Sequence, residues 1–244
     1  MSLKGQTALV TGAGRRIGEA IALALAEQQA NVVIHYRHSG SRAESLRQSL
    51  VARGVQAFSV KADFDNPEEA DSVIKRARRE AGPIQILLNS ASEFQPEPLD
   101  AMTHASLVHN MTVNAWAPFA LTRAFARQTT SGKVVNFIDA QVAGHDLTHA
   151  SYILSKHLLA TLTTMTALQY APGITVNAVA PGLILPPEGK DDSYLENLAK
   201  SLPLKRHGGL ADITRAVLFL LESEFVTGQV IYVDGGRHLI GGPR

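Results

Sequence analysis

The chain has 244 residues, and 23 lysines and arginines against 22 aspartates and glutamates leave a formal net charge of +1. This near balance argues against a protein that binds nucleic acid or a membrane surface through a basic patch. Hydrophobic residues make up 45% and charged residues 18%, which is typical of a globular protein and not of a disordered one. The chain has no cysteine, which excludes disulfides, thiolate nucleophiles and cysteine-ligated metal centres. The N-terminus lacks the apolar run of a signal peptide and no stretch reaches the length of a membrane span, so a cytoplasmic location is expected.

Short β-branched runs alternate with longer segments of helical periodicity. The predicted strands cover residues 7–11, 31–36, 55–60, 84–88, 133–138, 174–179 and 230–233. Between them, segments such as 17–29, 43–53 and 150–171 space apolar residues three and four apart. This alternation predicts an α/β fold in which residues 1–244 form a single domain. We expect a Rossmann-type, doubly wound parallel sheet of about seven strands with helices on both faces.

A glycine-rich segment follows the first predicted strand and opens the first predicted helix. It reads Thr11-Gly12-Ala13-Gly14-Arg15-Arg16-Ile17-Gly18. Glycines allow a tight turn there and let backbone N–H groups approach a pyrophosphate at the helix N-terminus. Because the segment begins a βαβ series, it predicts a dinucleotide site and not an ordinary turn. The candidate contacts are Gly12, Arg15, Arg16 and Ile17.

The end of the second predicted strand distinguishes between NAD and NADP. An NAD enzyme usually places a carboxylate there to hold the ribose hydroxyls. This chain reads His35-Tyr36-Arg37-His38-Ser39, in which Arg37 can bind a phosphate through paired hydrogen bonds and Ser39 can add a donor. Arg16 would add positive charge on the same side. The alternative is a set of solvated surface cations, which fits this edge of the sheet less well, so NADPH is the expected cofactor.

Tyr152 and Lys156 lie four residues apart in a predicted helix, so their side chains share one face. A nearby ammonium favours the phenolate, so the spacing predicts a lowered pKa for Tyr152 and a proton donor for a substrate that receives a hydride. Such a pair alone usually just lies on a helix surface. The nine histidines are scattered, and His145 and His149 fall on a predicted irregular loop, so no metal site is expected.

Several ordered motifs resemble the short-chain dehydrogenase/reductase superfamily over essentially the whole chain. They are the glycine-rich loop, Asn89-Ser90-Ala91, Asn114, Tyr152-x-x-x-Lys156, Pro181-Gly182 and Val233-Asp234-Gly235-Gly236. Three departures from the commonest pattern are informative: Arg16 replaces a loop glycine, Ser92-Glu93-Phe94 follows Ala91, and Asp139 replaces a serine. Together with residues 35–39, these departures look like the pteridine reductase branch, which includes bacterial dihydromonapterin reductases.

The resemblance implies an NADPH-dependent reductase of a pterin C=N bond, with dihydromonapterin, dihydrobiopterin or dihydrofolate as candidate substrates. It implies Tyr152 as the acid and Lys156 as its electrostatic partner and ribose anchor. Asp139 would orient substrate or pass protons, and Asn114 would support the active-site helix and a water path. Phe94 would stack on the pterin, and Ser92 would bond near the substrate or the cofactor phosphates. The further cofactor contacts implied are Ala62, Asp63, Phe64, Asn89, Ser90, Ala91, Pro181, Gly182 and Leu183.

Several alternatives stay open. An ionised aspartate accepts hydrogen bonds only, so Asp139 would repel a developing alkoxide, although it could instead simply cap a turn. Phe94 could be ordinary core packing, and Asp63 could cap a helix. The rival functions are a carbonyl reductase of ketones, aldehydes or 3-oxoacyl groups, and a non-catalytic dinucleotide-binding sensor. The resemblance also implies a homotetramer, and residues 186–201, rich in proline, glycine and charge, predict a mobile substrate lid.

Overall fold

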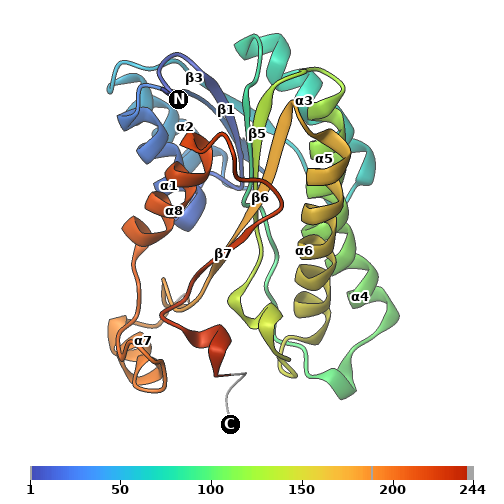
Figure 1. Cartoon of the computed structure of the whole chain (residues 1–244), viewed down its shortest axis with the longest axis vertical. Helices are drawn as coiled ribbons and strands as arrows, with labels where there is room; N and C mark the ends of the chain where they lie inside the picture. Colours follow the sequence, from blue (N-terminus) through green and yellow to red (C-terminus); the bar gives the residue numbers. More distant parts are fainter. Residues whose placement is uncertain (1, 188, 241–244) are drawn as a thin grey trace.

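The computed structural model describes residues 2–187 and 189–240, and its centre is one seven-stranded sheet in the order β3-β2-β1-β4-β5-β6-β7 (Figure 1). All neighbouring strands are parallel. The strands are β1 (Thr7–Thr11), β2 (Asn31–Tyr36), β3 (Ala57–Lys61), β4 (Ile86–Asn89), β5 (Gly132–Phe137), β6 (Ile174–Pro181) and β7 (Val230–Val233). The predicted Rossmann-type α/β fold is confirmed, although four of the predicted strands are shifted at their ends by one or two residues.

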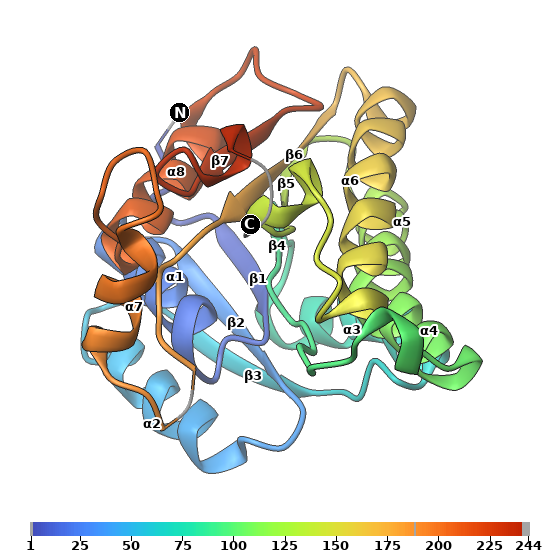
Figure 2. The same cartoon turned by 90° about the horizontal axis from the view of Figure 1, so that it is seen from below.

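Helices cover both faces of the sheet (Figures 1 and 2). On one face lie α1 (Arg16–Glu27), α2 (Gly40–Val51) and α8 (Leu210–Glu222). On the other lie α3 (Pro67–Ala81), α5 (Ala117–Ala126) and α6 (Ala150–Tyr170), with α4 (His104–Met111) packed beside α6. None of the described helices has the length and apolar character needed to cross a bilayer.

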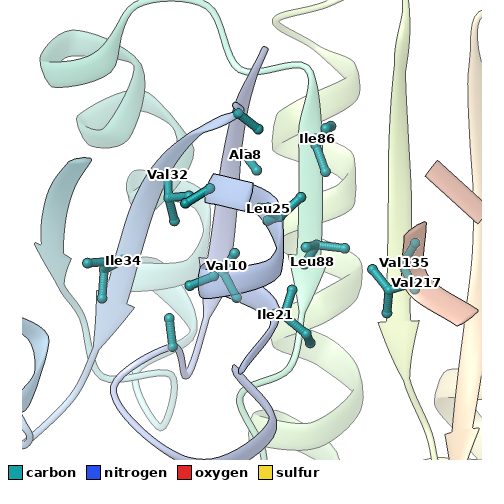
Figure 3. Packing of buried hydrophobic residues seen from close by; sticks show 14 of the residues in the cluster. Ala8, Val10, Ile21, Leu25, Val32, Ile34, Ile86, Leu88, Val135 and Val217 are labelled. Atoms are coloured by element: carbon teal, nitrogen blue, oxygen red, sulfur yellow. The ribbon is translucent and has the colours of Figure 1, made fainter. Parts of the chain in front are cut away.

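The core between β1 and α1 fixes the position of the loop that joins them. Val10 of β1 and Leu88 of β4 pack with Ile21 and Leu25 of α1, and all four side chains are buried (Figure 3). Truncating a fully buried leucine such as Leu25 to alanine costs about 2–5 kcal/mol. The β1–α1 loop is therefore held at both ends by close-packed elements.

Helix α3 begins and ends at residues that are favourable at helix termini. The Asn66 side chain accepts a hydrogen bond from the Glu68 N–H at 3.1 Å, and Pro67 occupies the first helical position. Glu68 and Glu69 lie at the positive end of the helix dipole. Gly82 ends the helix with φ +78°, a conformation that glycine adopts without strain.

A π-helical turn over Thr112–Trp116 joins α4 to α5 and was not predicted. Pro118 has no N–H to donate to the carbonyl of Asn114 four residues earlier, so a regular α-helical ladder cannot continue through this point. Asn114 lies inside the turn and is fully buried. Turns of this kind frequently occur at functional sites.

The carboxyl ends of the strands gather the loops that carry the predicted site residues. The loop before α6, helix α7 (Asp192–Ala199) and the 3₁₀ turn at Arg237–Leu239 all lie at the lower end in Figure 1. The predicted lid, residues 186–201, therefore contains α7, while its residue 188 lies outside the described residues, as do residues 1 and 241–244 of the predicted domain.

Candidate active site

The β1–α1 loop makes a turn that only glycine permits. Gly12 has φ +65°, and a Cβ added there would lie 2.8 Å from the Cα of Ala91. A Cβ on Gly18 would come within 2.4 Å of the Gly12 carbonyl oxygen. The Thr11 hydroxyl oxygen accepts hydrogen bonds from the N–H groups of Ser90 and Ala91 at 3.0 and 2.9 Å. The loop thus lies against the end of β4 with its backbone close to the N-terminus of α1, which is the geometry of an anion cradle.

Arg16 connects this loop to the chain that follows β6. Its φ of +55° lies in the left-handed region, which explains why glycine is usual at this position. Its Nη1 and Nη2 both donate to the carbonyl oxygen of Pro186 at 3.1 Å. Arg15, beside it, is exposed, whereas Ile17 packs partly against the core. Arg16 therefore anchors the first residue of the predicted lid.

His35 joins the glycine-rich loop to the end of β3. Gly12 N–H donates to His35 Nδ1 at 3.1 Å, and His35 Nε2 lies 3.2 Å from the carbonyl oxygen of Ala62. These partners require a neutral ring with its hydrogen on Nε2. Burial lowers the pKa of His35 to about 4. The ring also stacks on Phe64 at 4.2 Å, and both side chains are buried.

The remaining residues after β2 surround the loop in different ways. Ser39 is the N-terminal capping position of α2, and its Cβ lies 3.3 Å from where a Cβ on Gly14 would be. Tyr36 packs partly against the core, and His38 is exposed. Gly14 therefore keeps the loop and the start of α2 in close contact.

Arg37 is half-exposed at the end of β2 and faces two carboxylates. Its Nη1 pairs with Glu93 Oε1 and lies 3.6 Å from Asp63 Oδ1. His109 Nε2 lies 2.6 Å from Glu93 Oε2, and His109 Nδ1 lies 2.7 Å from Asp65 Oδ1. The pKa of His109 is raised, and the hydrogen bond to Glu93 is the largest cause. Burial opposes ionisation of Glu93, but its bonds to His109 and Arg37 prevail and lower its pKa.

Sequence reasoning missed the roles of Glu93 and His109 in this network. Glu93 stood out only as part of a departure from the commonest motif, and nothing in the spacing of His109 connects it to β2. The network forms because β4 lies next to β1 and β1 lies next to β2, which brings the ends of distant segments to one edge of the sheet.

Asn114 ties the segment after β4 to helix α6. Its Oδ1 accepts from Glu93 N–H at 2.8 Å and from the Ser92 hydroxyl at 3.1 Å. Its Nδ2 lies 3.0 Å from the Glu93 carbonyl oxygen and 3.2 Å from Ser155 Oγ. Ser155 in turn donates to the carbonyl oxygen of Tyr152 at 2.6 Å. Asn114 thus supports the helix that carries Tyr152.

Asp139, Tyr152 and Lys156 meet at the carboxyl end of β5. Tyr152 Oη donates to Asp139 Oδ2 at 3.0 Å, while Asp139 Oδ1 accepts from Gln141 N–H at 2.8 Å. Asp139 therefore caps the turn after β5 and bonds Tyr152 at the same time. Lys156 is buried, and its Nζ donates to the carbonyl oxygen of Phe137 at 2.9 Å.

The pKa of Tyr152 is shifted in the direction opposite to the one predicted. Burial raises the pKa of Tyr152 well above its ordinary value, and the charge of Asp139 raises it further. The Lys156 ammonium bonds the Phe137 carbonyl and lies 5.6 Å from the centre of the Tyr152 ring, whereas the Asp139 carboxylate contacts the phenol directly. Burial also lowers the pKa of Lys156 to about 8 and raises the pKa of Asp139. Tyr152 consequently keeps its proton at neutral pH.

Phe94 stands at the rim of this group with half of its side chain exposed, so the core-packing alternative is wrong. Its ring stacks on His149 with centres 4.2 Å apart and meets the edge of Tyr152 at 4.7 Å. His149 Nδ1 lies 2.8 Å from Asp146 Oδ2, which holds the imidazole in place. Phe94 therefore keeps a half-exposed ring beside the Tyr152 ring, with one of its faces against His149.

The segment after β6 is held by close backbone contacts. A Cβ on Gly182 would lie 2.6 Å from the Cα of Asp234, and Gly182 N–H donates to the Val233 carbonyl oxygen at 3.0 Å. The Leu183 carbonyl oxygen accepts from Gly208 N–H at 3.0 Å. After β7, the turn carrying Arg237 packs against the turn that follows Asp139, a neighbour that the sequence did not reveal.

Comparisons with known proteins agree with this geometry. The family model described as Enoyl-(Acyl carrier protein) reductase matches residues 12–238. The 3-oxoacyl-[acyl-carrier-protein] reductase FabG of Staphylococcus epidermidis is 33% identical over 243 residues, which cover 96% of this chain and 99% of that protein. The chain belongs to the short-chain dehydrogenase/reductase superfamily. It is an oxidoreductase of that superfamily, as the ordered motifs predicted.

Two solved structures are similar to this chain over nearly its whole length. FolM alternative dihydrofolate reductase 1 from Brucella canis, complexed with NADP, has a TM-score of 0.93 and 34% identity, covering 99% of this chain and 97% of that chain. A blue fluorescent protein from a metagenomic library, in complex with NADPH, has a TM-score of 0.88 and 32% identity, covering 97% and 99%. Within residues 2–187 and 189–240, no three or more His, Asp or Glu side chains are grouped to hold a metal ion.

Proposed function

We propose that this short-chain reductase uses NADPH to reduce a pterin C=N bond, converting a dihydropterin to a tetrahydropterin. The observation that carries the proposal is the 3.0 Å hydrogen bond from Tyr152 to Asp139 beside the half-exposed ring of Phe94. A carboxylate offers acceptors to the amino and ring N–H groups of a pterin, and an aromatic ring offers a stacking surface. The similarity to a FolM alternative dihydrofolate reductase supports the same substrate class.

The residues around the β1–α1 loop fit NADP. The glycines leave room for a pyrophosphate at the N-terminus of α1, where Gly12, Arg15, Arg16 and Ile17 would lie along it. Arg37 and Ser39 would hold the 2′-phosphate, since none of residues 35–39 is a carboxylate. The remaining proposed contacts are the backbones of His35, Tyr36 and His38, then Ala62, Asp63 and Phe64, Asn89, Ser90 and Ala91, and Pro181, Gly182 and Leu183. The similar structures hold NADP and NADPH, which supports this choice.

NADPH, when bound, supplies the hydride that reaches the carbon of the C=N bond. Tyr152 then donates the proton to the neighbouring nitrogen, because its raised pKa keeps the phenol protonated until a substrate nitrogen accepts. Lys156, near the ring, stabilises the tyrosinate that donation leaves and would also anchor the ribose. Asp139 orients the hydroxyl and the substrate N–H groups, and Ser92 and Asn114 keep the Phe94 segment in place.

A carbonyl reductase is the second candidate function. The 33% identity to FabG of Staphylococcus epidermidis supports a 3-oxoacyl substrate as directly as the structural similarity supports a pterin. The same Tyr152 and Lys156 would serve either reaction. We favour the pterin because an Asp139 carboxylate next to the Tyr152 hydroxyl would repel an alkoxide forming on a ketone oxygen.

The decisive experiment compares substrates on one enzyme preparation. NADPH oxidation is measured with 7,8-dihydromonapterin, 7,8-dihydrobiopterin, dihydrofolate, simple ketones and a 3-oxoacyl thioester, for the wild type and Asp139→Ser. We expect turnover of a dihydropterin by the wild type, a loss of at least about 100-fold in Asp139→Ser, and a smaller change with ketones. Turnover of ketones or the thioester with no dihydropterin activity refutes the pterin assignment. Turnover of nothing, with NADPH bound, supports a non-catalytic sensor.

Residues 186–201 are proposed as the lid over this substrate site, except that residue 188 lies outside the described residues. Arg16 anchors the start of the segment at Pro186, and α7 forms its body at the carboxyl edge. A homotetramer and a cytoplasmic location remain part of the proposal.

A further inference from the structure

The guanidinium proposed to hold the 2′-phosphate already has an anionic partner within the chain. Arg37 Nη1 pairs with Glu93 Oε1, and Asp63 Oδ1 is the more distant neighbour at 3.6 Å. The side chains of Arg37 and Glu93 are 36% and 21% exposed, so the pair is partly shielded from water. A phosphate that binds the same Nη1 donor must displace the Glu93 carboxylate or share the donor with it.

Glu93 has bonding partners besides Arg37. Its N–H and its carbonyl oxygen both bond Asn114, at 2.8 and 3.0 Å. Its second carboxylate oxygen lies 2.6 Å from His109 Nε2, and His109 is held on its other side by Asp65 at 2.7 Å. The carboxylate therefore has a second partner, His109, that would hold it near Arg37 if Arg37 turned to a ligand.

We infer that Glu93 is a specificity-determining residue that competes with the 2′-phosphate of NADP for Arg37. The inference rests on the proposed use of Arg37 as the phosphate reader. A carboxylate and a phosphate both favour the same planar pair of guanidinium N–H groups, so one reduces the other's access. The negative charge that remains on Glu93 also repels the phosphate. Glu93 thus weakens binding of the phosphorylated cofactor and helps its release, with little effect on a nucleotide that lacks the 2′-phosphate.

The test measures binding and does not depend on turnover. Wild type, Glu93→Gln, Arg37→Gln and the double variant are titrated with NADPH and NADH by fluorescence. Adenosine 2′,5′-bisphosphate and AMP are titrated by calorimetry to isolate the phosphate. Asp71→Asn is the matched control, because it removes one surface carboxylate that pairs with an arginine, Arg123, at 2.9 Å.

Glu93→Gln is expected to bind NADPH and adenosine 2′,5′-bisphosphate about three- to tenfold more tightly, relative to NADH and AMP, than the wild type. Asp71→Asn should leave the ratio unchanged, and adding Glu93→Gln to Arg37→Gln should produce no further gain. Glu93→Ser serves as a second variant, with the same expected direction. An unchanged or weaker preference for the phosphate in the Glu93 variants overturns the inference and would make Glu93 a support for Arg37.

Two further outcomes separate this inference from the proposed function. If Arg37→Gln leaves the preference for NADPH over NADH intact, then the proposed binding of the 2′-phosphate by Arg37 and the inference about Glu93 are both wrong. If the binding results are as expected but no dihydropterin is reduced, the pterin assignment fails while the role of Glu93 stands.

Discussion

Acid is expected to loosen the phosphate loop by protonating His35. The neutral ring accepts from Gly12 N–H through Nδ1 and bonds the Ala62 carbonyl through Nε2, so a proton added to Nδ1 abolishes the first bond. It would also place a positive charge in a side chain that is 2% exposed and stacked on Phe64. Both consequences favour opening of the loop or unfolding of the chain.

The size of the effect follows from the pKa of His35 in the two states. Burial lowers the pKa from 6.5 to about 4 in the folded protein. Between these values the unfolded chain binds a proton that the folded chain does not, so the free energy of unfolding falls as the pH falls. The full difference corresponds to about 3 kcal/mol, of which roughly 2 kcal/mol is lost between pH 7 and pH 5.

Urea unfolding at pH 7 and pH 5, at one protein concentration, measures this loss. His35→Asn keeps an acceptor near Gly12 but cannot titrate, and His104→Asn removes an exposed histidine at the start of α4 as a control. The wild type and the control should each lose about 2 kcal/mol more stability than His35→Asn over this interval. His109, whose pKa is raised, gains a proton in the same range, but it is common to all three proteins and cancels in the difference. Equal losses in the three proteins would refute the role assigned to His35.

Three further predictions concern the site and the assembly. Tyr152→Phe should lower kcat with a dihydropterin about 100- to 10,000-fold while the Kd for NADPH changes less than about twofold, because only the proton donor is removed; an unchanged kcat in stopped-flow assays would exclude Tyr152 as the acid. Gly12→Ala should weaken NADPH binding more than about tenfold because its Cβ would lie 2.8 Å from the Ala91 Cα. Gly5→Ala, with φ +75° but no atom within 4 Å of the added Cβ, should cost about 1 kcal/mol of stability and leave NADPH binding intact, so equal binding losses would contradict the local explanation. Light scattering after size-exclusion chromatography should give four times the mass of one chain, and a monomer at micromolar concentration would exclude the homotetramer.

The sheet could be predicted because its strands are apolar on both faces. All five residues of β1 are buried, and such runs between helical segments imply a covered parallel sheet. The exact ends could not be predicted because they depend on pairing with neighbours. The strand predicted at 55–60 begins at Ala57, whose partner in β2 is Val32. The π-helical turn had a usable signal in Pro118, but its consequence for Asn114 depends on the packing of α6 against that turn.

Most side chains of the candidate site could be predicted from the sequence, but the interactions between their charges could not. Spacing correctly placed Tyr152 and Lys156 together, and the motif comparison added Asp139. The sequence did not indicate that Lys156 Nζ bonds the Phe137 carbonyl oxygen, because a backbone acceptor is present at every residue and cannot be recognised from the spacing of side chains. Arg37 and Glu93 belong to different motifs, and only the strand order brings their charges together.

The raised pKa of Tyr152 bears on its proposed role as a proton donor. A tyrosinate stabilised by an adjacent ammonium would accept a proton, as oxidation of an alcohol or amine requires. A buried phenol bonded to a carboxylate retains its proton, and in the proposed reaction it would give the proton to the substrate atom that hydride transfer makes basic. Asp139 also raises the pKa of Lys156 against the opposing effect of burial, which favours retention of the ammonium that receives the tyrosinate charge. At neutral pH the site therefore holds Tyr152 in the protonated form that the proposed reduction requires.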